Sequence, residues 1–577
     1  MDKEARKSAI LCHKNGEEYF TFSFWLDCPE PKINKQFNMN RKAEEPLESF
    51  LSRLRENLLK QMTKKKSKKS KKTQNEDTGS PKEAEIDVEI KFKSGDGVPL
   101  ELDLTNNAKD FLVQDKLRME ILSVIFDINV NPPLVQAAKL PDAILAGFML
   151  YPFKLDFLFG CKEDSIFSWF ISDENRSAKD IDAAKWTKVS EGFFYTVQND
   201  HVDRFVKLEI TPKMGDRSGP LFEVVSKNPV SAGPGKCPFE DRQAFTKEKL
   251  PKDQFRVVTY NLLADLYADS DFSRTVLHPQ CPAYALEINY RKSLFIKELM
   301  GYNADIICLQ EVDKKIYEGD LYPVFSSLNY NGVFDLKGGQ VSEGVACFWN
   351  DQKFQLVESS KIVLSEALLN DAKFKDILDV LDTNEKLKES MLNRTTALQT
   401  VVLHAKDSDK ALVIGTTHLY FKPDADHIRL LQIATVMREL EDIVKRYSEK
   451  NAEKQYSTLL CGDFNSSPPF GVLEFMRKKL VDKDYPDWKS AEGEEVLDFK
   501  IEHSLNMDSA CGTPQYTNYT IGFKDCLDYI FYQTDHLQVT NVIPFPSEEE
   551  LSLYQAIPNV VFPSDHIACI SDLKWKS

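Results

Sequence analysis

The chain has 577 residues, enough for two to four domains with cores of their own. Its hydrophobic fraction of 42% and charged fraction of 28% exclude a largely disordered protein. The net charge of -16 repels polyanions, which excludes a grip on long duplex DNA through a basic surface. A nucleic-acid ligand is therefore expected to be short or single-stranded.

The eleven cysteines are scattered without a C-x-x-C pair, which excludes a zinc ribbon and a disulfide scaffold and favours a reducing, intracellular compartment. No apolar stretch approaches the roughly 18 to 20 residues that a membrane span needs, so we expect a soluble protein. Residues 1–14 include Asp2 and Glu4 and lack the apolar run of a signal peptide. The acids also count against a transit peptide.

Residues 1–85 are predicted to form a strand and an amphipathic helix. The segment 18–27 alternates aromatic and hydroxyl side chains, and the apolar residues at 47–59 recur at helical spacing. Seven lysines and two serines occupy residues 64–72, and a polar stretch follows to about residue 82. We expect a disordered loop at 64–82, with an RNA-attracting or targeting patch as the alternative.

Residues 86–235 are predicted to form a β-rich, sandwich-like accessory domain, because short alternating runs recur between polar turns. Trp169 and Trp186 are expected in its core, although an exposed indole would instead stack on a base. The stretch after Asn228 collects proline, glycine and charge. It predicts a linker at 236–254. The runs are 86–92, 153–159, 165–171, 193–198 and 205–212.

Residues 255–577 alternate strand-like runs with amphipathic helical patterns at 290–300 and 428–445, which predicts an α/β domain. Six of the strand-like runs lead into polar residues that suit phosphate and magnesium. Phosphoryl transfer needs mainly positioning and charge stabilisation, so this series predicts a metal-dependent phosphodiesterase. The polar residues are Asn261, Glu311, His418, Asp463 with Asn465, Asp528, and Asp565 with His566.

Glu311 ends the run ADIICLQE, where burial would penalise a carboxylate that no cation accompanies. Magnesium prefers oxygen ligands and keeps several waters, so one or two carboxylates suffice for it. We therefore predict that Glu311 is a metal ligand. The alternative is a surface residue after a strand.

Asp463 and Asn465 lie two residues apart in STLLCGDFNSSP, and such residues share a face in extended chain. Asp463 is predicted to orient or deprotonate the attacking water, and Asn465 to donate to phosphate or contact the metal. An Asx-turn cap is an equally weighted alternative on this motif alone.

His418 and His566 are two of only nine histidines, and both lie at the ends of apolar strands. Either side chain is suited to donate to a phosphate oxygen, and a satisfied core histidine is the alternative. Asp528 is the expected partner that fixes the ring of His566, and Asp565 is a candidate second metal or water ligand. Asn261 adds little by itself, because asparagine commonly follows a strand.

Taken together, these residues resemble the exonuclease-endonuclease-phosphatase superfamily, which implies a four-layer α/β sandwich of two packed sheets flanked by helices over residues 255–577. TYNLLAD, SEGVACF, YTNYTIGFKDCLDYIFY and PSDHI look like its deadenylase branch. More narrowly, AGPGKCPF, FSRTVL, GYNAD and the β-rich N-terminal region are similar to the mitochondrial 2',5'-phosphodiesterases.

This resemblance implies hydrolysis of 2',5'-linked oligoadenylate and 3',5'-linked poly(A) to 5'-AMP with Mg2+, with Mn2+ as an alternative cofactor. The lack of an apolar span gives no reason to expect a membrane partner. It implies that Pro423 and Phe523 flank an adenine base, a sensible role for a rigid ring and an aromatic face. The matrix of mitochondria is the implied location, with the cytosol as the alternative.

Two other functions stay open at this point. One is a phosphatase of the same superfamily acting on a nucleotide cofactor, an inositol phosphate or a lipid. The other is a catalytically dead RNA-binding protein, which the complete set of motif residues disfavours. In the main hypothesis, magnesium is held mainly by Glu311 with Asp463 and Asn465 nearby, and His418 and His566 stabilise the developing charge.

Overall fold

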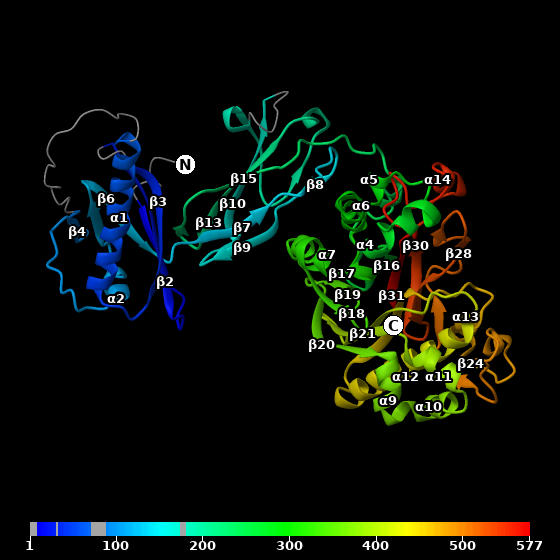
Figure 1. Cartoon of the computed structure of the whole chain (residues 1–577). Helices are drawn as coiled ribbons and strands as arrows, with labels where there is room; N and C mark the ends of the chain where they lie inside the picture. The colour runs from blue at the N-terminus through cyan, green and yellow to red at the C-terminus, as the bar shows by residue number, and fades with distance from the viewer. Residues whose placement is uncertain (1–7, 30–32, 71–87, 174–180, 577) are drawn as a thin grey trace, which may run out of the picture. The chain divides into compact units, whose positions relative to one another are not determined.

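The computed structural model describes residues 8–29, 33–70, 88–173 and 181–576. The chain forms two compact units (Figure 1). The first unit comprises Met1–Leu140, Lys154–Tyr195 and Arg204–Lys227, and the second comprises Pro141–Phe153, Thr196–Asp203 and Asn228–Ser577. In the described part of the chain, no helix is long and apolar enough to cross a membrane.

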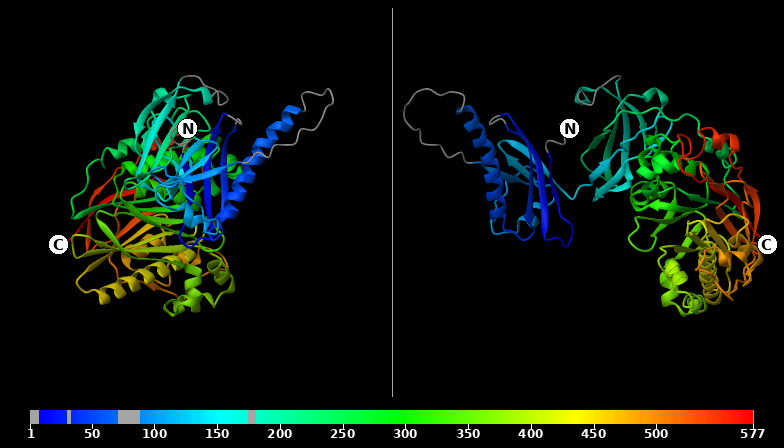
Figure 2. Two further views of the ribbon diagram at one scale, coloured as in Figure 1. Left: turned by 90° about the vertical axis from the view of Figure 1, so that its left-hand side faces the viewer. Right: turned by 45° about the vertical axis from the view of Figure 1, so that its right-hand side comes forward.

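The first unit contains a six-stranded sheet whose order is β3-β2-β1-β6-β5-β4. The α1 helix lies along one face of this sheet (Figure 1 and Figure 2). Alternate residues of β2 are buried, as expected for a strand with one covered face. The bounds are β1 Ser8–Cys12, β2 Tyr19–Cys28, β3 Ile33–Lys42, α1 Leu47–Ser70, β4 Ile90–Lys93, α2 Ala108–Leu112, β5 Arg118–Ile121 and β6 Val124–Val130.

Two expectations for this region are corrected. The predicted domain boundary at residue 86 falls inside the fold, because β4, β5 and β6 complete the sheet begun by β1, β2 and β3. The predicted loop at 64–82 begins within α1, which continues to Ser70 because lysine has a high helix propensity. Residues 71–82 of that prediction lie outside the described residues.

The rest of the first unit is β-rich, as predicted. A sheet of order β11-β10-β13-β14, with β15 also on β13, contains Trp169 fully buried as expected. Trp186 is only half-buried, because it lies at the start of an edge strand. One face of its ring contacts Lys207, whose Nζ lies 5.4 Å from the ring centroid. The bounds are β7 Leu134–Lys139, β9 Phe153–Leu158, β10 Cys161–Ser172, β11 Trp186–Glu191, β12 Tyr195–Thr196, β13 Val206–Met214, β14 Arg217–Ser218 and β15 Phe222–Val225, and one residue each of β9 and β12 belongs to the second unit.

The second unit contains two six-stranded sheets of order β18-β19-β17-β16-β31-β30 and β20-β21-β22-β23-β29-β26. Buried side chains from both sheets form one cluster, so the sheets pack face to face. The bounds are β16 Gln254–Asn261, β17 Ile306–Asp313, β18 Tyr330–Leu336, β19 Glu343–Asn350, β20 Phe354–Val363, β21 Ala397–Ala405, β22 Lys410–His418, β23 Gln455–Asp463, β26 Met507–Ser509, β29 Asp528–Gln533, β30 Leu537–Val542 and β31 Cys569–Trp575.

Helices cover the outer faces of these sheets and complete the predicted four-layer α/β sandwich (Figure 1). The α12 helix (Asp426–Lys450) packs against the second sheet with α9 (Leu364–Asn370), α10 (Lys375–Leu381), α11 (Glu385–Leu392) and α13 (Gly471–Lys478). The α6 helix (Ile288–Gly301) lies beside the first sheet (Figure 1). Both amphipathic helices expected in this unit are therefore present.

The predicted linker at 236–254 is instead part of the second unit. It contains α3 (Phe239–Gln243), and the buried side chain of Arg242 donates to the carbonyl oxygens of Pro544 and Ala568 at 2.9 and 2.7 Å. The composition that predicted a linker therefore does not prevent this segment from packing against the second unit, where Arg242 anchors it.

Candidate active site

Parallel strand pairs bring the predicted site residues to one edge of the sandwich. In β16 and β17, Asn261 pairs with Gln310, and in β22 and β23, His418 pairs with Asp463. Asp463 also pairs with Asp528 of the antiparallel strand β29. Because the carboxyl ends of parallel strands meet at one sheet edge, side chains from both sheets converge there.

Asn261 joins the two sheets at this edge. Its Nδ2 donates to the Glu311 Oε1 and to the Asp463 Oδ2, both at 3.0 Å, and its Oδ1 accepts from the backbone N–H of Leu263 at 3.0 Å. The Asn261 side chain is buried. One carboxamide thereby fixes the separation of two carboxylates that belong to different sheets.

Glu311 is aimed into the site by an irregularity at the end of β17. The register of β17 on β19 shifts between Leu309 and Val312, and Glu311 takes a left-handed φ of 52°. Its Oε2 accepts from the backbone N–H of Ala264 at 2.9 Å. Burial raises the pKa of Glu311, as expected for a carboxylate that lacks a full positive partner.

His418 lies between acidic and basic neighbours. Its Nε2 is 3.6 Å from the Asp463 Oδ2, and its Nδ1 is 3.2 Å from the Lys337 Nζ. Lys337 is paired in turn with the Glu343 Oε1 at 2.7 Å. Burial, with the charge of Lys337, lowers the pKa of His418 well below its usual value, so the ring is neutral.

Lys337 and Glu343 were not among the predicted site residues. Glu343 lies in the SEGVACF motif, but nothing in that motif distinguished its carboxylate from an ordinary strand residue. The Glu343 side chain is completely buried, and it also accepts from the Tyr267 hydroxyl at 3.2 Å. No charge pattern around Lys337 distinguishes it from other lysines, because its role depends on tertiary contacts with His418 and Glu343.

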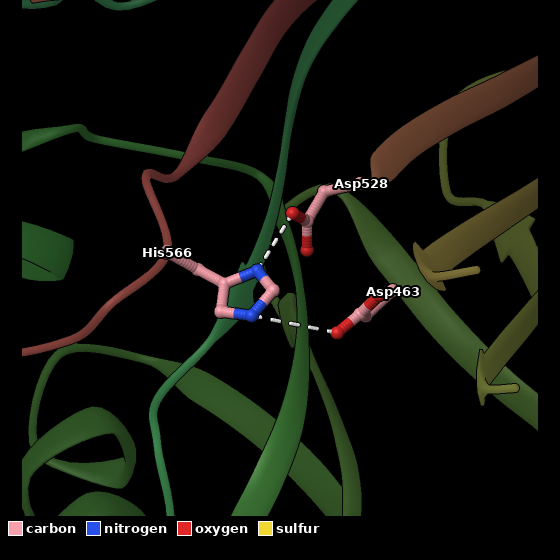
Figure 3. A group of neighbouring side chains, drawn as sticks. All are labelled: Asp463, Asp528 and His566. Atoms are coloured by element: carbon pink, nitrogen blue, oxygen red, sulfur yellow. Dashed lines mark hydrogen bonds and ion pairs between the residues drawn. The ribbon is translucent and has the colours of Figure 1, made fainter. Parts of the chain in front are cut away.

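His566 and Asp528 form a buried pair (Figure 3). The His566 Nδ1 lies 2.8 Å from the Asp528 Oδ2, and its Nε2 points toward the Asp463 Oδ2 at 3.6 Å. Burial alone would lower the pKa of His566, but the carboxylates of Asp528, Asp463 and Asp565 outweigh it and raise this pKa well above its usual value. The predicted partnership of Asp528 with His566 is thus present in the geometry.

Asp463 is held from two sides. Its Oδ1 accepts from the backbone N–H of Asn465 at 2.9 Å, while Asn261 donates to its Oδ2. Burial, with the nearby charge of Asp528, raises the pKa of Asp463 to about 7. Asn465 also takes a left-handed φ, of 50°, and its Nδ2 donates to the Leu419 carbonyl at 3.0 Å.

Asp463, Asp528 and His566 bring three candidate ligand atoms within 4.8 Å of one another (Figure 3). In this cluster the His566 Nδ1 lies 2.8 Å from the Asp528 Oδ2, and the Nε2 is the ring nitrogen that faces Asp463. The oxygen atoms of Glu311, Asp463 and Asn465 are the donor types that suit a hard cation such as magnesium.

A cavity of about 1040 Å³ opens above these residues. Eight of the predicted residues line it, whereas Asn261 and Asp528 lie behind them. The eight are Glu311, His418, Pro423, Asp463, Asn465, Phe523, Asp565 and His566. Phe523 keeps 47% of its surface exposed, so its ring is free to receive a planar ligand.

Asp565 lies at the margin of the cluster. Its Oδ2 accepts from the Asn518 Nδ2 at 3.4 Å, which leaves its carboxylate less tightly held than those of Glu311 and Asp463. The structure therefore places it beside His566 and in the cavity wall, as the sequence order requires.

Comparison with known families matches two parts of the chain. The model described as the endonuclease/exonuclease/phosphatase family matches residues 258–566. A second model, described as a 2',5'-phosphodiesterase 12-like N-terminal domain, matches residues 132–231. Enzymes of the first family generally use a divalent metal ion.

Similar curated proteins cover nearly the whole chain. Proteins named 2',5'-phosphodiesterase 12 from Rattus norvegicus and Homo sapiens are 39% and 37% identical to it, over 95% of this chain and 93% of each relative. The Schizosaccharomyces pombe protein named CCR4-Not complex 3'-5'-exoribonuclease subunit Ccr4 is 29% identical over 56% of this chain and 49% of its own. The solved structure of ANGEL2, titled a 2',3'-cyclic phosphatase in complex with adenosine-2',3'-vanadate, aligns at 20% identity with a TM-score of 0.47, over 56% of this chain and 96% of that chain.

Proposed function

Because the chain belongs to the endonuclease/exonuclease/phosphatase family and is a hydrolase of the phosphodiesterase and 3'-5' exonuclease type, we propose that it is a magnesium-dependent oligoadenylate phosphodiesterase. Its substrates are 2',5'-linked oligoadenylate and 3',5'-linked poly(A), and its product is 5'-AMP. One observation carries this proposal: Asn261 joins Glu311 to Asp463 beside two histidines, in a cavity that Pro423 and Phe523 also line.

The donor set fits a magnesium ion. Glu311 and Asp463 are buried carboxylates whose pKa values are raised, which indicates that their negative charges are undercompensated by the protein. We assign Glu311 as the main ligand, with Asp463 and Asn465 nearby and Asp565 as a further candidate. When bound, the ion supplies charge neutralisation and polarisation at the scissile phosphate.

Asp463 is assigned to the attacking water. A pKa of about 7 suits a general base that works near neutral pH, and the backbone N–H of Asn465 fixes the direction of its carboxylate. The water attacks phosphorus in line with the departing ribose oxygen, and the proton moves toward Asp463.

The two histidines supply donors for the charge that builds on the phosphate oxygens. His566 is cationic because Asp528 holds its pKa high, so its Nε2 carries a proton for donation into the cavity. His418 is neutral, and the Lys337 ammonium at its Nδ1 orients the ring so that Nε2 carries the hydrogen.

Selection of adenylate is assigned to Pro423 and Phe523. Both line the cavity, and a rigid ring with an exposed aromatic face suits a planar base. The names of the similar proteins support an RNA substrate, since these proteins include a 2',5'-phosphodiesterase and a 3'-5'-exoribonuclease.

The test is to incubate the protein of residues 1–577 and Mg2+ separately with 2',5'-linked and 3',5'-linked adenylate trimers, and to follow AMP release. Glu311→Ala and EDTA are the controls that should abolish it. Release from both trimers, or faster release from the 2',5' trimer, supports the proposal. Release from neither would refute it and direct attention to phosphorylated cofactors and lipids.

We place this activity in the mitochondrial matrix, on the resemblance of the whole chain to mitochondrial 2',5'-phosphodiesterases. Fractionation of cells that express the protein with a C-terminal tag tests this location. Recovery in the cytosol alone would refute it.

A further inference from the structure

Among the residues that the structure describes, one cation in the cavity wall has no carboxylate partner. Lys337, Arg394 and Arg429 are the lysine and arginine residues that line the cavity. Lys337 is paired with Glu343 at 2.7 Å, and Arg429 with Asp426 at 2.5 Å. Within the described ranges, Arg394 forms no ion pair.

Arg394 is nevertheless held in place. Its Nε donates to the Ser390 carbonyl at 2.7 Å, and its guanidinium carbon lies 4.3 Å from the centroid of the Tyr420 ring. Its own carbonyl accepts from the Ser365 hydroxyl at 2.8 Å. Among the residues that the structure describes, none accepts a hydrogen bond from its two terminal nitrogens. The fork of the side chain is therefore preorganised and unused.

The surroundings of Arg394 connect it to the catalytic residues. The backbone N–H of Gly338 donates to the Thr395 carbonyl at 2.8 Å, so the residue after Arg394 is bonded to the residue after Lys337. Lys337 in turn contacts His418 at 3.2 Å. Tyr420, beneath the guanidinium, lies between His418 and Pro423 in the same loop. Arg394 thus lines the same cavity as His418 and Pro423.

We propose that Arg394 binds the second phosphate of the substrate. This phosphate is attached to the 5' oxygen of the nucleotide whose 2' or 3' oxygen is the leaving group, which is the nucleotide next to the released AMP. This inference rests on the proposed function. The released 5'-AMP carries only the scissile phosphate, so any second phosphate of an oligoadenylate belongs to the chain left behind. A planar guanidinium with two free nitrogens matches a phosphate in a bidentate manner.

The inference predicts that a second phosphate on the substrate raises kcat/KM even when no third base is present. The probes are three 2',5'-linked compounds: the dinucleotide ApA with only the scissile phosphate, its 5'-phosphorylated form pApA, and the trimer ApApA. The phosphate gain is the ratio of kcat/KM for pApA to kcat/KM for ApA. Charge-assisted hydrogen bonds of this kind predict a gain of roughly 10- to 100-fold in the unaltered enzyme.

In Arg394→Gln the phosphate gain should fall close to 1, mainly through KM, and Arg394→Lys should keep part of it because the charge remains without the fork. The matched control is Arg446→Gln, an arginine of α12 that is half-exposed, pairs with Asp442 and does not line the cavity. Its phosphate gain should equal that of the unaltered enzyme. Thermal unfolding of each variant verifies that the fold is retained.

Three results would overturn the inference. An unchanged phosphate gain in Arg394→Gln would leave the oligoadenylate activity standing and remove Arg394 from substrate binding. A loss confined to ApApA, with the gain for pApA retained, would show a contact with the third nucleoside rather than with phosphate. No turnover of any of the three compounds by the unaltered enzyme would refute the proposed function and this inference together.

Discussion

Replacement of Asn261 by alanine tests the idea that one carboxamide aligns the active site. The change removes two hydrogen bonds of 3.0 Å from Nδ2 to Glu311 and Asp463. Hydrogen bonds to charged groups contribute about 1.5 to 3 kcal/mol each, so the pair amounts to about 3 to 6 kcal/mol. If the two hydrogen bonds stabilise the transition state by that amount, their loss lowers kcat/KM roughly 10²- to 10⁴-fold.

The assay is AMP release from the 2',5' adenylate trimer, measured against Asn541→Ala. Asn541 also donates from its Nδ2 to a carboxylate, the Asp572 Oδ2 at 3.3 Å, but it lies on an exposed part of β30 away from the cavity. The control should retain activity within about twofold. An Asn261→Ala enzyme with more than a tenth of the original kcat/KM would refute the reasoning.

Three further predictions concern pH, base recognition and stability. Asp528→Asn removes the charge that raises the pKa of His566, so the alkaline limb of the kcat/KM profile should move to lower pH; an unmoved limb would contradict the assigned role of His566. Phe523→Ala should raise KM for adenylate about 5- to 100-fold through lost stacking, and an unchanged KM would place the base elsewhere. Asp320→Ala removes the carboxylate that lies 2.9 Å from the buried Lys292 ammonium and leaves that charge without its ion-pair partner. Hydrogen exchange in β17 should then report a decrease of about 3 to 5 kcal/mol in the free energy of unfolding. A loss below 1 kcal/mol would contradict that assignment, and Asp379→Ala, in a largely exposed pair with Lys375, is the control with a small effect.

The strands of the second unit were predictable because hydrophobic periodicity records burial on each face of a sheet. The expected runs before Glu311, His418 and Asp463 are β17, β22 and β23, and their polar ends lie together as the parallel pairing requires. Most of the site residues could therefore be predicted from the order of the strands, since each residue lies at the end of its own strand.

The parts that escaped prediction depend on contacts between distant segments. Asn261 added little as a motif, yet it bonds residues that are 50 and 202 positions away in the chain. Lys337 is defined by its contacts with His418 and Glu343, which no local pattern encodes. The predicted domain boundary at residue 86 is wrong for a related reason. Alternation of apolar and polar residues predicts strands, but it does not predict which sheet they join.

The left-handed backbone at Glu311 makes the site a local weakness of the molecule. A non-glycine residue with φ of 52° stores roughly 1 to 2 kcal/mol of conformational strain, and its buried carboxylate adds a desolvation penalty. Selection for thermostability alone would accordingly enrich glycine at this position, which relieves both penalties and removes the main candidate ligand for metal. Efforts to engineer a hardier enzyme should therefore hold residue 311 fixed and seek their gains in the outer helices.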